Sequence, residues 1–444
     1  MYRRIVVQAL KGLGLAALLM TAIAITSGVV LTHARLDAVL REALTSKTLN
    51  IDSPGGWTEC GTFAMEYTRE ADPFLNAIET RWPRPAHHPC DDLKALIAGP
   101  PYPYALNPPS PYVNYPFGAR HLAAIAVSVL TVSQAETMYR FLSYAAVVLL
   151  FLGAWRNSER LAIGVVLPIA FFLTFAFEQH RYGDNLLWAP SFFVGFAALG
   201  VLLALPRTFA SGFDRVSFYC FLGAMIAYFD VLEGAIPVLV SLAIVLNHFF
   251  FVARRAHASP RAYRTAAAVQ ALMVFGCFLL AYVAVTGVRL LIISQLVPSA
   301  IADFEHQLSY RTGSSVIDVG VVHLSDVFGR LWLERDQMTG NDWATWLLAV
   351  SAFAWASSAA AFAVLRRRVE RPAAVVTDLA VLAVAGAGIF VWYVLFRNHT
   401  YIHAWLMVRM LALPAAYGFV AAWVLATAPR LAAERSSQTV RAAT

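Results

Sequence analysis

The residues best able to hold an anionic ligand cluster near the end of this 444-residue chain, in the stretch FRNHTYIHAWLMVRM (396–410). His399 and His403 stand four positions apart, which places both imidazoles on one face of a helix. Both can donate hydrogen bonds to a ligand, serve a purely structural role, or bind a metal for which the stretch supplies no third ligand. Arg409 falls in an apolar run, where a guanidinium requires an anionic partner, either a carboxylate of the protein or a ligand phosphate.

Two further cationic sites have the same chemistry. Arg120 and His121 precede the apolar run LAAIAVSVLTV (122–132), and Arg311 ends the polar stretch ADFEHQLSYR (302–311). Helix N-termini attract phosphate, and arginine binds phosphate through two parallel hydrogen bonds. The sequence therefore predicts that all three residues bind a phosphate; the alternative for Arg120 is a side chain that extends along the membrane surface.

A carboxylate in the first third of the chain is the candidate general base. Glu59 lies in WTEC, directly after a glycine-rich turn, so its position is constrained, and a carboxylate held in this way can take a proton from a hydroxyl. The alternative is an acidic residue that only stabilises the first turn of a helix. Asp52 is a second, weaker candidate for the same role.

Composition identifies the environment of these residues. The chain is 59% apolar and only 14% charged, with mean hydropathy +0.61, against about 45–50% and about 25% in soluble domains. These values exclude an ordinary soluble enzyme, a disordered chain and a disulfide scaffold. Nucleic acid is not an expected partner despite a net charge of +7, because the basic residues are sorted by membrane side. No P-loop, dinucleotide fingerprint, GxSxG or HExxH motif is present.

The predicted fold class is an all-α polytopic membrane protein, because helices satisfy their own backbone hydrogen bonds in hydrocarbon. We expect one integral membrane domain over residues 1–444, with the first segment retained because it is longer than a signal peptide core. About ten apolar segments are long enough to approach a membrane span: 5–31, 139–155, 161–177, 188–205, 216–232, 235–252, 265–297, 343–365, 374–396 and 404–427.

Arginine and lysine placement predicts the orientation. With the N-terminus inside, basic residues outnumber acidic ones in every inner segment, so both termini are expected in the cytoplasm. Two long segments, 32–138 and 298–342, then lie outside. The first combines a helical run (36–44), a helix-like run (71–82), a Pro/Tyr-rich extended segment (99–121) and a short apolar helix (122–132) expected to lie in the membrane interface.

Cys60 and Cys90 both fall in the first outer segment, where oxidising conditions favour a disulfide; two free thiols are the alternative. A zinc site formed by His87, His88, Cys90 and Asp91 matches no strong ligand spacing. No metal ligand and no cofactor is therefore predicted, although a divalent cation stays open.

This layout resembles the GT-C class of membrane glycosyltransferases, with WTEC, ARH (119–121) and NHTYIHAWLMVR (398–409) as the residue-level support. NHTYIH and FDVLEG (229–234) are also similar to uncharacterised membrane proteins of bacterial polysaccharide loci. The resemblance implies transfer of a sugar from a polyprenyl-phosphate donor to an acceptor glycan, lipid or protein. It further implies a site facing the periplasm in the bacterial inner membrane, arginine or histidine on the phosphate, and an acid of the first loop as base. Family members often carry that acid soon after the first span, whereas here the nearest are Asp37 and Asp52.

Two other classes remain alternatives. A transporter or flippase of a lipid-linked anionic substrate would place charges at the middle of the bilayer and show repeated halves with broken helices. A polysaccharide polymerase or ligase also uses polyprenyl donors but carries its large outer loop late in the chain. Here no convincing internal repeat is present, and the larger outer segment is the first.

Overall fold

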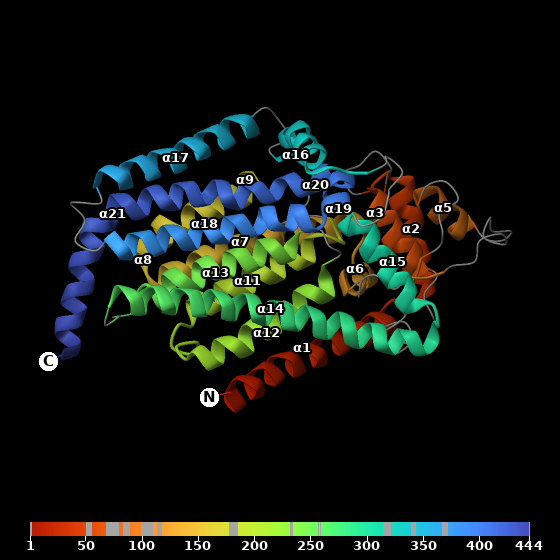
Figure 1. Cartoon of the computed structure of the whole chain (residues 1–444). Helices are drawn as coiled ribbons and strands as arrows, with labels where there is room; N and C mark the ends of the chain where they lie inside the picture. The colour runs from red at the N-terminus through yellow and green to blue at the C-terminus, as the bar shows by residue number, and fades with distance from the viewer. Residues whose placement is uncertain are drawn as a thin grey trace.

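The protein is a bundle of long, roughly parallel and antiparallel helices with a cap of short helices at one end (Figure 1). Both chain termini lie toward the opposite end of the bundle. The computed structural model describes residues 2–49, 56–67, 80–82, 89–98, 110–112, 118–176, 185–230, 234–255, 257, 259–313, 321–338, 343–365 and 372–443.

Seven helical segments within this described part are long and apolar enough to cross a membrane, which makes the chain an all-α multi-pass membrane protein. Their positions agree with the sequence-based expectation to within a few residues at most ends. They are α1 (Tyr2–Val30), α7 (Val132–Asn157), α13 (Ala235–Asn247) continued by the π-helix η3 (His248–Val252), α14 (Pro260–Leu296), α17 (Trp343–Leu365), α18 (Pro372–Leu395), and α20 (Ala404–Met407) continued through η5 (Val408–Leu411) into α21 (Ala412–Ala443).

The other three segments expected to span are also helical, but they are shorter or less apolar. A π-helical turn interrupts one of them, between α8 and α9. They are α8 (Glu159–Leu161) with η2 (Ala162–Val166) and α9 (Leu167–Phe175), α11 (Ala189–Ala204), and α12 (Gly212–Phe229).

Helix packing follows the apolar surfaces. α7 packs along α11, α1 against α12, α12 against α14, and both α17 and α18 against α21. Small residues permit the closest approach: Gly153 of α7 meets the backbone of Gly200 of α11. The largest core cluster fills this bundle, with Phe196, Leu239 and Tyr417 fully buried.

The cap is built from residues 32–138, the first of the two segments expected to lie outside the membrane. Its helices are α2 (His33–Thr45), α3 (Gly56–Tyr67), α5 (Pro89–Ala98) and α6 (Gly118–Val129). The strands β1 (Thr80–Trp82) and β2 (Ser110–Tyr112) pair antiparallel beside it. The end of the run 71–82, expected to be helical, is therefore a strand, because its backbone pairs with the Pro/Tyr-rich segment. The rest of that run lies outside the described residues.

Two arginines of α2 fix the cap helices. Arg35 donates to the carbonyl oxygens of Val127 and Leu130 at the end of α6. Arg41 donates to the carbonyl oxygen of Ile97 at the end of α5. Helix C-termini leave such carbonyls without partners in the helix, and cations there are stabilising. The N-terminus of α6 consequently points away from α2.

The segment 122–132, expected to form a helix in the membrane interface, belongs to α6 as far as Val129. The helix begins four residues earlier, at Gly118, and most of it is buried, Arg120 and His121 included. It packs against α1, α2, α7 and α12. Most apolar residues of α6 therefore point into the cap and the bundle, whereas Val129 at its end is 76% exposed.

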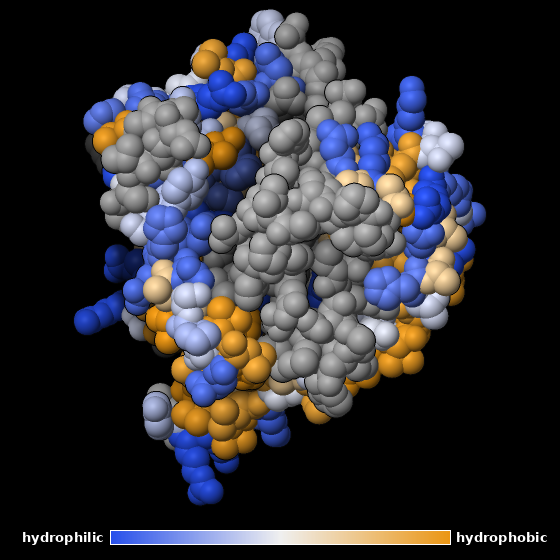
Figure 2. Space-filling view, turned by 90° about the vertical axis from the view of Figure 1, so that its right-hand side faces the viewer, coloured by the Kyte–Doolittle hydropathy of each residue, from blue (hydrophilic) through white to orange (hydrophobic). Residues whose placement is uncertain are grey.

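The second outer segment contains α15 (Ala300–Thr312), α16 (Leu324–Leu333) and the 3-10 turn η4 (Arg335–Met338). α14 runs for 37 residues, and α15 follows it after a short turn and packs on α19 (Arg397–Ile402). A helix of that length measures about 55 Å, longer than a bilayer core requires. Figure 2 looks onto this end of the molecule, where hydrophilic and hydrophobic residues mix on the described surface.

Candidate functional site

Arg120 and His121 are buried at the first turn of α6, with exposed fractions of 1% and 0%. Arg120 Nη2 donates to His121 Nε2 at 2.9 Å, and His121 Nδ1 lies 2.5 Å from the hydroxyl of Tyr228 on α12. A guanidinium only donates, so Nε2 accepts and the neutral imidazole carries its proton on Nδ1. The Tyr228 hydroxyl then accepts from His121 and donates to the carbonyl oxygen of Met20 on α1 at 3.4 Å.

Gly118 permits this arrangement. A side chain at Gly118 would collide with the ring of Tyr228, so α6 can approach α12 closely only with glycine at this position. The hydrogen-bond chain therefore joins α6, α12 and α1, three elements that are far apart in the sequence. Tyr228 was not among the residues predicted from the sequence, because a tyrosine near the end of an apolar segment is common at any membrane interface.

Glu59 is buried in the first turn of α3, with 5% of its surface exposed. Its Oε1 accepts the backbone N–H of Leu186 at 3.1 Å, in the turn that leads into α11. Asn185 caps the same turn, since its Oδ1 accepts the N–H groups of Leu187 and Trp188. The carboxylate of Glu59 is thus oriented by a backbone contact. Asp52, the second acid predicted, lies outside the described residues.

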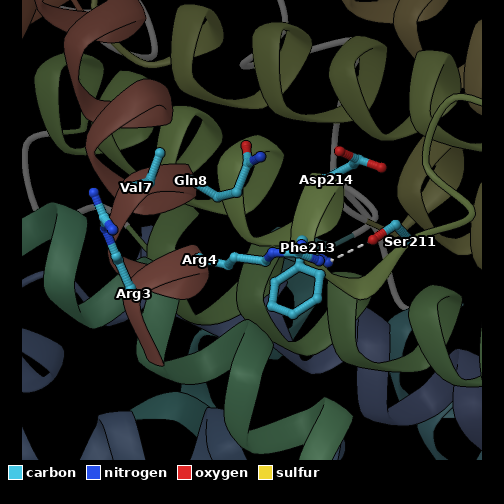
Figure 3. Close-up of a pocket in the computed structure, with 7 residues that line it drawn as sticks. All are labelled: Arg3, Arg4, Val7, Gln8, Ser211, Phe213 and Asp214. Atoms are coloured by element: carbon cyan, nitrogen blue, oxygen red, sulfur yellow. Dashed lines mark hydrogen bonds between the residues drawn. The ribbon is translucent and has the colours of Figure 1, made fainter. Parts of the chain in front are cut away.

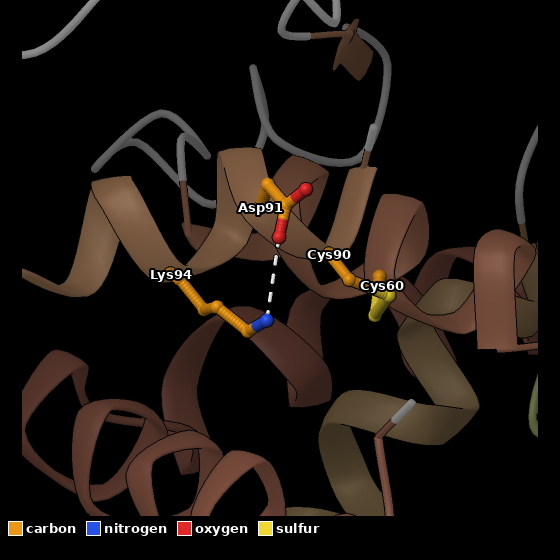
Figure 4. Close-up of a disulfide and its surroundings, with 4 residues drawn as sticks. All are labelled: Cys60, Cys90, Asp91 and Lys94. Carbon is orange, nitrogen blue, oxygen red and sulfur yellow. Dashed lines mark hydrogen bonds and ion pairs between the residues drawn. A yellow bond between two sulfur atoms is a disulfide. The ribbon is translucent and has the colours of Figure 1, made fainter. Parts of the chain in front are cut away.

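The Cys60–Cys90 disulfide expected from the sequence is present and joins α3 to α5 (Figure 4). Both sulfur-bearing residues are buried, and they are packed with Phe63 and Leu93 in the core of the cap. Glu59 directly precedes the first of these cysteines, so the bridge restrains the helix that carries the candidate base. Cys220 and Cys277 remain free thiols in the buried helix faces.

Residues 185–192, which we call the junction, bring several parts of the chain together. Leu187 and Trp188 pack in one apolar cluster with Ala119, the residue before Arg120, and with Leu406 of α20. The rings of Trp188 and Trp405 lie 5.5 Å apart. The junction therefore contacts the elements that carry Glu59, Arg120 and the 396–410 stretch.

Arg409 contacts the junction through the ring of Phe192. It is 1% exposed within η5, and its guanidinium carbon lies 5.0 Å from the centre of the Phe192 ring. The neighbouring Met410 packs on Gly234, which has a positive φ of +92° at the start of α13. Four residues before Gly234, Asp230 ends α12 and is a buried acid with 3% exposure.

The histidine pair lies at a break in the helix. α19 ends at Ile402, and His403 leaves helical geometry before α20 begins. The rings of His399 and His403 are nevertheless adjacent, with centres 4.7 Å apart, and the His403 N–H donates to the His399 carbonyl oxygen at 3.0 Å. The sequence predicted the adjacency correctly but not the break.

Arg311 belongs to the same group of residues. Arg397 donates to the Gly313 carbonyl oxygen, and Asn398 donates to the Tyr310 carbonyl oxygen at 2.8 Å, so the end of α15 is fixed on α19. Burial, followed by the positive charge of Arg311, lowers the pKa of His403 from 6.5 to about 4. His403 is therefore a neutral hydrogen-bonding group at neutral pH.

The predicted residues thus form three groups: Arg120 with His121, Glu59 on the junction, and Arg311 with His399 and His403. Arg409 also contacts the junction, through Phe192. Among the described residues, no cluster of three or more His, Cys, Asp and Glu side chains is placed to hold a metal ion. His87 and His88 lie outside that part of the chain.

An apolar cavity of about 640 Å³ begins where the hydrogen-bond chain ends. Tyr228 forms part of its wall, and the remainder comes from α1 and α14. The wall includes one charged residue, Arg289, seven residues before the end of α14. The lining residues on α1 extend from Leu10 to Ile25, which corresponds to a length of about 22 Å at the rise of an α-helix.

No protein-family model, no curated protein and no solved structure matches the chain.

Proposed function

We propose that the chain is a membrane glycosyltransferase that moves a sugar from a polyprenyl-phosphate donor to an acceptor glycan, lipid or protein. The proposal includes ten membrane-spanning helices, cytoplasmic termini, a GT-C-like arrangement and a site facing the periplasm of a bacterial inner membrane. All ten expected segments are helical, and both termini lie toward the end of the bundle opposite the cap (Figure 1). These features are compatible with the proposed topology.

The observation that carries the proposal is the link between a long apolar cavity and buried cations. A polyprenyl chain is apolar along its whole length and ends in a phosphate. The cavity between α1 and α14 offers an apolar wall of about 22 Å. Tyr228 in that wall is hydrogen-bonded to His121, which is bonded to Arg120. Arg289 adds a cation toward the same end of the cavity.

The proposed reaction assigns a role to each group. The acceptor hydroxyl oxygen attacks the anomeric carbon of the donor sugar, and the bond from that carbon to the phosphate oxygen breaks. The electron pair remains on the phosphate, and in this scheme its growing charge is stabilised by Arg120, His121, Arg311, His399, His403 and Arg409. Glu59 takes the hydroxyl proton. No cofactor enters this scheme.

Preorganisation supports Glu59 as the base. Its contact with the Leu186 N–H and the adjacent disulfide restrain the carboxylate before any substrate binds. Asp230, at the end of α12, is another buried acid of the bundle. Sugar transfer in Glu59→Gln should therefore be compared with transfer in Asp230→Asn. The substitution of the general base abolishes transfer, whereas the substitution of an acid that only balances a nearby positive charge does not.

One observation favours a second candidate, the transport of a lipid-linked anionic substrate. His248, Tyr263 and Asp378 form a buried hydrogen-bonded cluster between η3, α14 and α18. Ionisable groups inside a membrane bundle often mark a translocation path. Transfer and transport differ in product, because only transfer yields a glycosylated acceptor and free polyprenyl phosphate.

Two glycine substitutions test whether the donor chain occupies the cavity. Gly14 lines the cavity, and a Cβ at this position meets no other atom, so Gly14→Phe should direct its ring into the cavity. Gly276 on α14 also faces open space but does not line the cavity, which makes Gly276→Phe the matched control. In purified full-length protein, Gly14→Phe should reduce polyprenyl-phosphate binding and sugar transfer at least tenfold, and Gly276→Phe should change neither.

Glu59→Gln should abolish transfer while polyprenyl-phosphate binding is retained. Unchanged transfer in Glu59→Gln would remove Glu59 as the base. Donor binding that persists in Gly14→Phe would show that the chain of the donor does not occupy this cavity. If the protein moves labelled donor across the bilayer and forms no glycosylated product, the proposed function is transport and not sugar transfer.

A further inference from the structure

A second cavity lies at the end of the bundle that carries both termini, away from the cap. Its volume is about 540 Å³, and it is formed by the first two turns of α1 and the start of α12 (Figure 3). α1 and α12 meet closely where Gly12 contacts the backbone of Ser217. The cavity lies beyond this contact. Its lining residues are Arg3, Arg4, Val7, Gln8, Ser211, Phe213 and Asp214.

The cavity is lined by hydrogen-bond donors that are available to a ligand. Within the described part of the chain, neither Arg3 nor Arg4 has a hydrogen bond or an ion pair, and Arg4 extends toward Ser211 and Phe213 in Figure 3. The Ser211 oxygen accepts the Phe213 N–H at 3.1 Å, which leaves the hydroxyl hydrogen able to donate elsewhere. Each guanidinium can supply paired donors that match a phosphate.

The local potential is positive. Asp214 is the one acid in the lining, and it also acts electrostatically on Arg215, the next residue on α12. Two arginines therefore outweigh one carboxylate, and the N-terminus of α12 adds a partial positive charge. These features favour an anion over a cation or a neutral ligand.

The apolar residues narrow the ligand class. Val7 and Phe213 share the cavity with the arginines, and Leu10, one turn further along α1, is 62% exposed. A ligand with a phosphate and a hydrocarbon tail would use both surfaces. We propose that this cavity binds the phosphate headgroup of an anionic phospholipid from the leaflet at this end of the bundle, with an acyl chain along α1. Basic pockets between membrane helices hold anionic lipid headgroups by the same chemistry.

The proposal is independent of the proposed transferase and is tested by native mass spectrometry of the delipidated full-length protein. The probes are phosphatidylglycerol, phosphatidylethanolamine and inorganic phosphate. The double variant Arg3→Gln/Arg4→Gln should weaken phosphatidylglycerol binding about thirtyfold, because each arginine near an anionic surface contributes a factor of about five. The control Arg261→Gln/Arg264→Gln removes two exposed arginines at the start of α14, outside the cavity, and should change binding less than threefold.

A second variant keeps the test decisive if the arginine substitutions impair folding. Asp214→Asn removes the negative charge from the lining, so phosphatidylglycerol binding should strengthen. Equal losses in the two double variants would overturn the site, since the effect would then be one of general charge. Equal binding of phosphatidylethanolamine would overturn the anionic specificity. Inorganic phosphate that binds as tightly as the lipid, with the same sensitivity to Arg3 and Arg4, would replace the lipid with free phosphate.

Discussion

His121 donates through Nδ1 to the hydroxyl of Tyr228, a residue 107 positions further along the chain. The hydroxyl in turn donates to the carbonyl oxygen of Met20. Arg120 fixes the tautomer of the buried histidine, and Tyr228 joins the cap to two bundle helices. Because Tyr228 also lines the cavity between α1 and α14, this contact connects the apolar wall to Arg120.

Tyr228→Phe tests that connection. The substitution leaves the buried Nδ1–H of His121 without its acceptor, which costs about 1–3 kcal/mol of unfolding free energy. Donor binding should fall with it, because the His121 ring, and with it the Arg120 side chain bonded to it, loses its hydrogen bond to α12. Thermal unfolding and lipid binding in detergent measure the two effects. The control is Tyr393→Phe, which removes a buried hydroxyl that donates to the Met407 carbonyl oxygen; equal effects on donor binding would contradict the role of Tyr228.

The Cys60–Cys90 bridge should stabilise the cap. The cysteines are separated by 30 positions, for which the chain-entropy estimate gives about 3–4 kcal/mol. A reductant should therefore lower the unfolding temperature of the protein, and the variant Cys60→Ser/Cys90→Ser should start from that lower value. Reductant should have no further effect on the variant. If a reductant still lowers the unfolding temperature of Cys60→Ser/Cys90→Ser, a group other than this disulfide is responsible for the reductant effect.

Stability should depend on pH through His403. Its pKa is lowered from 6.5 to about 4 in the folded chain, so the unfolded chain binds more protons between these two values. The stabilising contribution is fully present above pH 6.5 and is lost as the pH falls toward 4. His403→Gln should flatten this part of the profile of unfolding temperature against pH. His306→Gln, at an exposed position on α15, should leave the profile unchanged.

The cluster of His248 and Asp378 should be structurally essential. Their side chains lie 2.9 Å apart and are 2% exposed each, and the Tyr263 hydroxyl donates to the same carboxylate oxygen. Asp378→Asn weakens the hydrogen bonds that the buried carboxylate makes with His248 and Tyr263, for which the cost is about 1–3 kcal/mol. The triple variant His248→Leu/Tyr263→Phe/Asp378→Leu should recover part of this loss, because it removes all three hydrogen-bonding groups of the cluster together. If the unfolding temperature does not recover, the hydrogen bonds of the cluster themselves stabilise the fold. The loss in Asp378→Asn would then not come from buried polar groups left without partners.

Gly234 should tolerate no side chain. Its φ is +92°, a backbone conformation that costs other residues about 1–2 kcal/mol, and an added Cβ would collide with Met410 beside Arg409. Gly234→Ala should therefore lower the unfolding temperature and displace η5. Gly388→Ala, at an open position inside α18, should instead raise stability by about 0.5–1 kcal/mol. Similar unfolding temperatures for Gly234→Ala and Gly388→Ala would contradict the requirement for glycine at position 234.

Composition and spacing alone predicted most of the helical architecture. Each apolar helix satisfies its own backbone hydrogen bonds, so its position follows from local sequence, as the match between the expected segment 343–365 and α17 illustrates. The disulfide was also predictable, because only two cysteines lie outside the apolar segments.

Only the tertiary structure decided which side chains meet. The contacts of Glu59 with Leu186, of His121 with Tyr228 and of Arg409 with Phe192 join residues more than 100 positions apart. The same is true of the burial of α6, whose short apolar sequence fits a membrane surface and a protein core equally well. Lipid-facing and protein-facing helix surfaces are both apolar, so hydrophobic periodicity cannot choose helix neighbours; close packing of whole helices makes that choice.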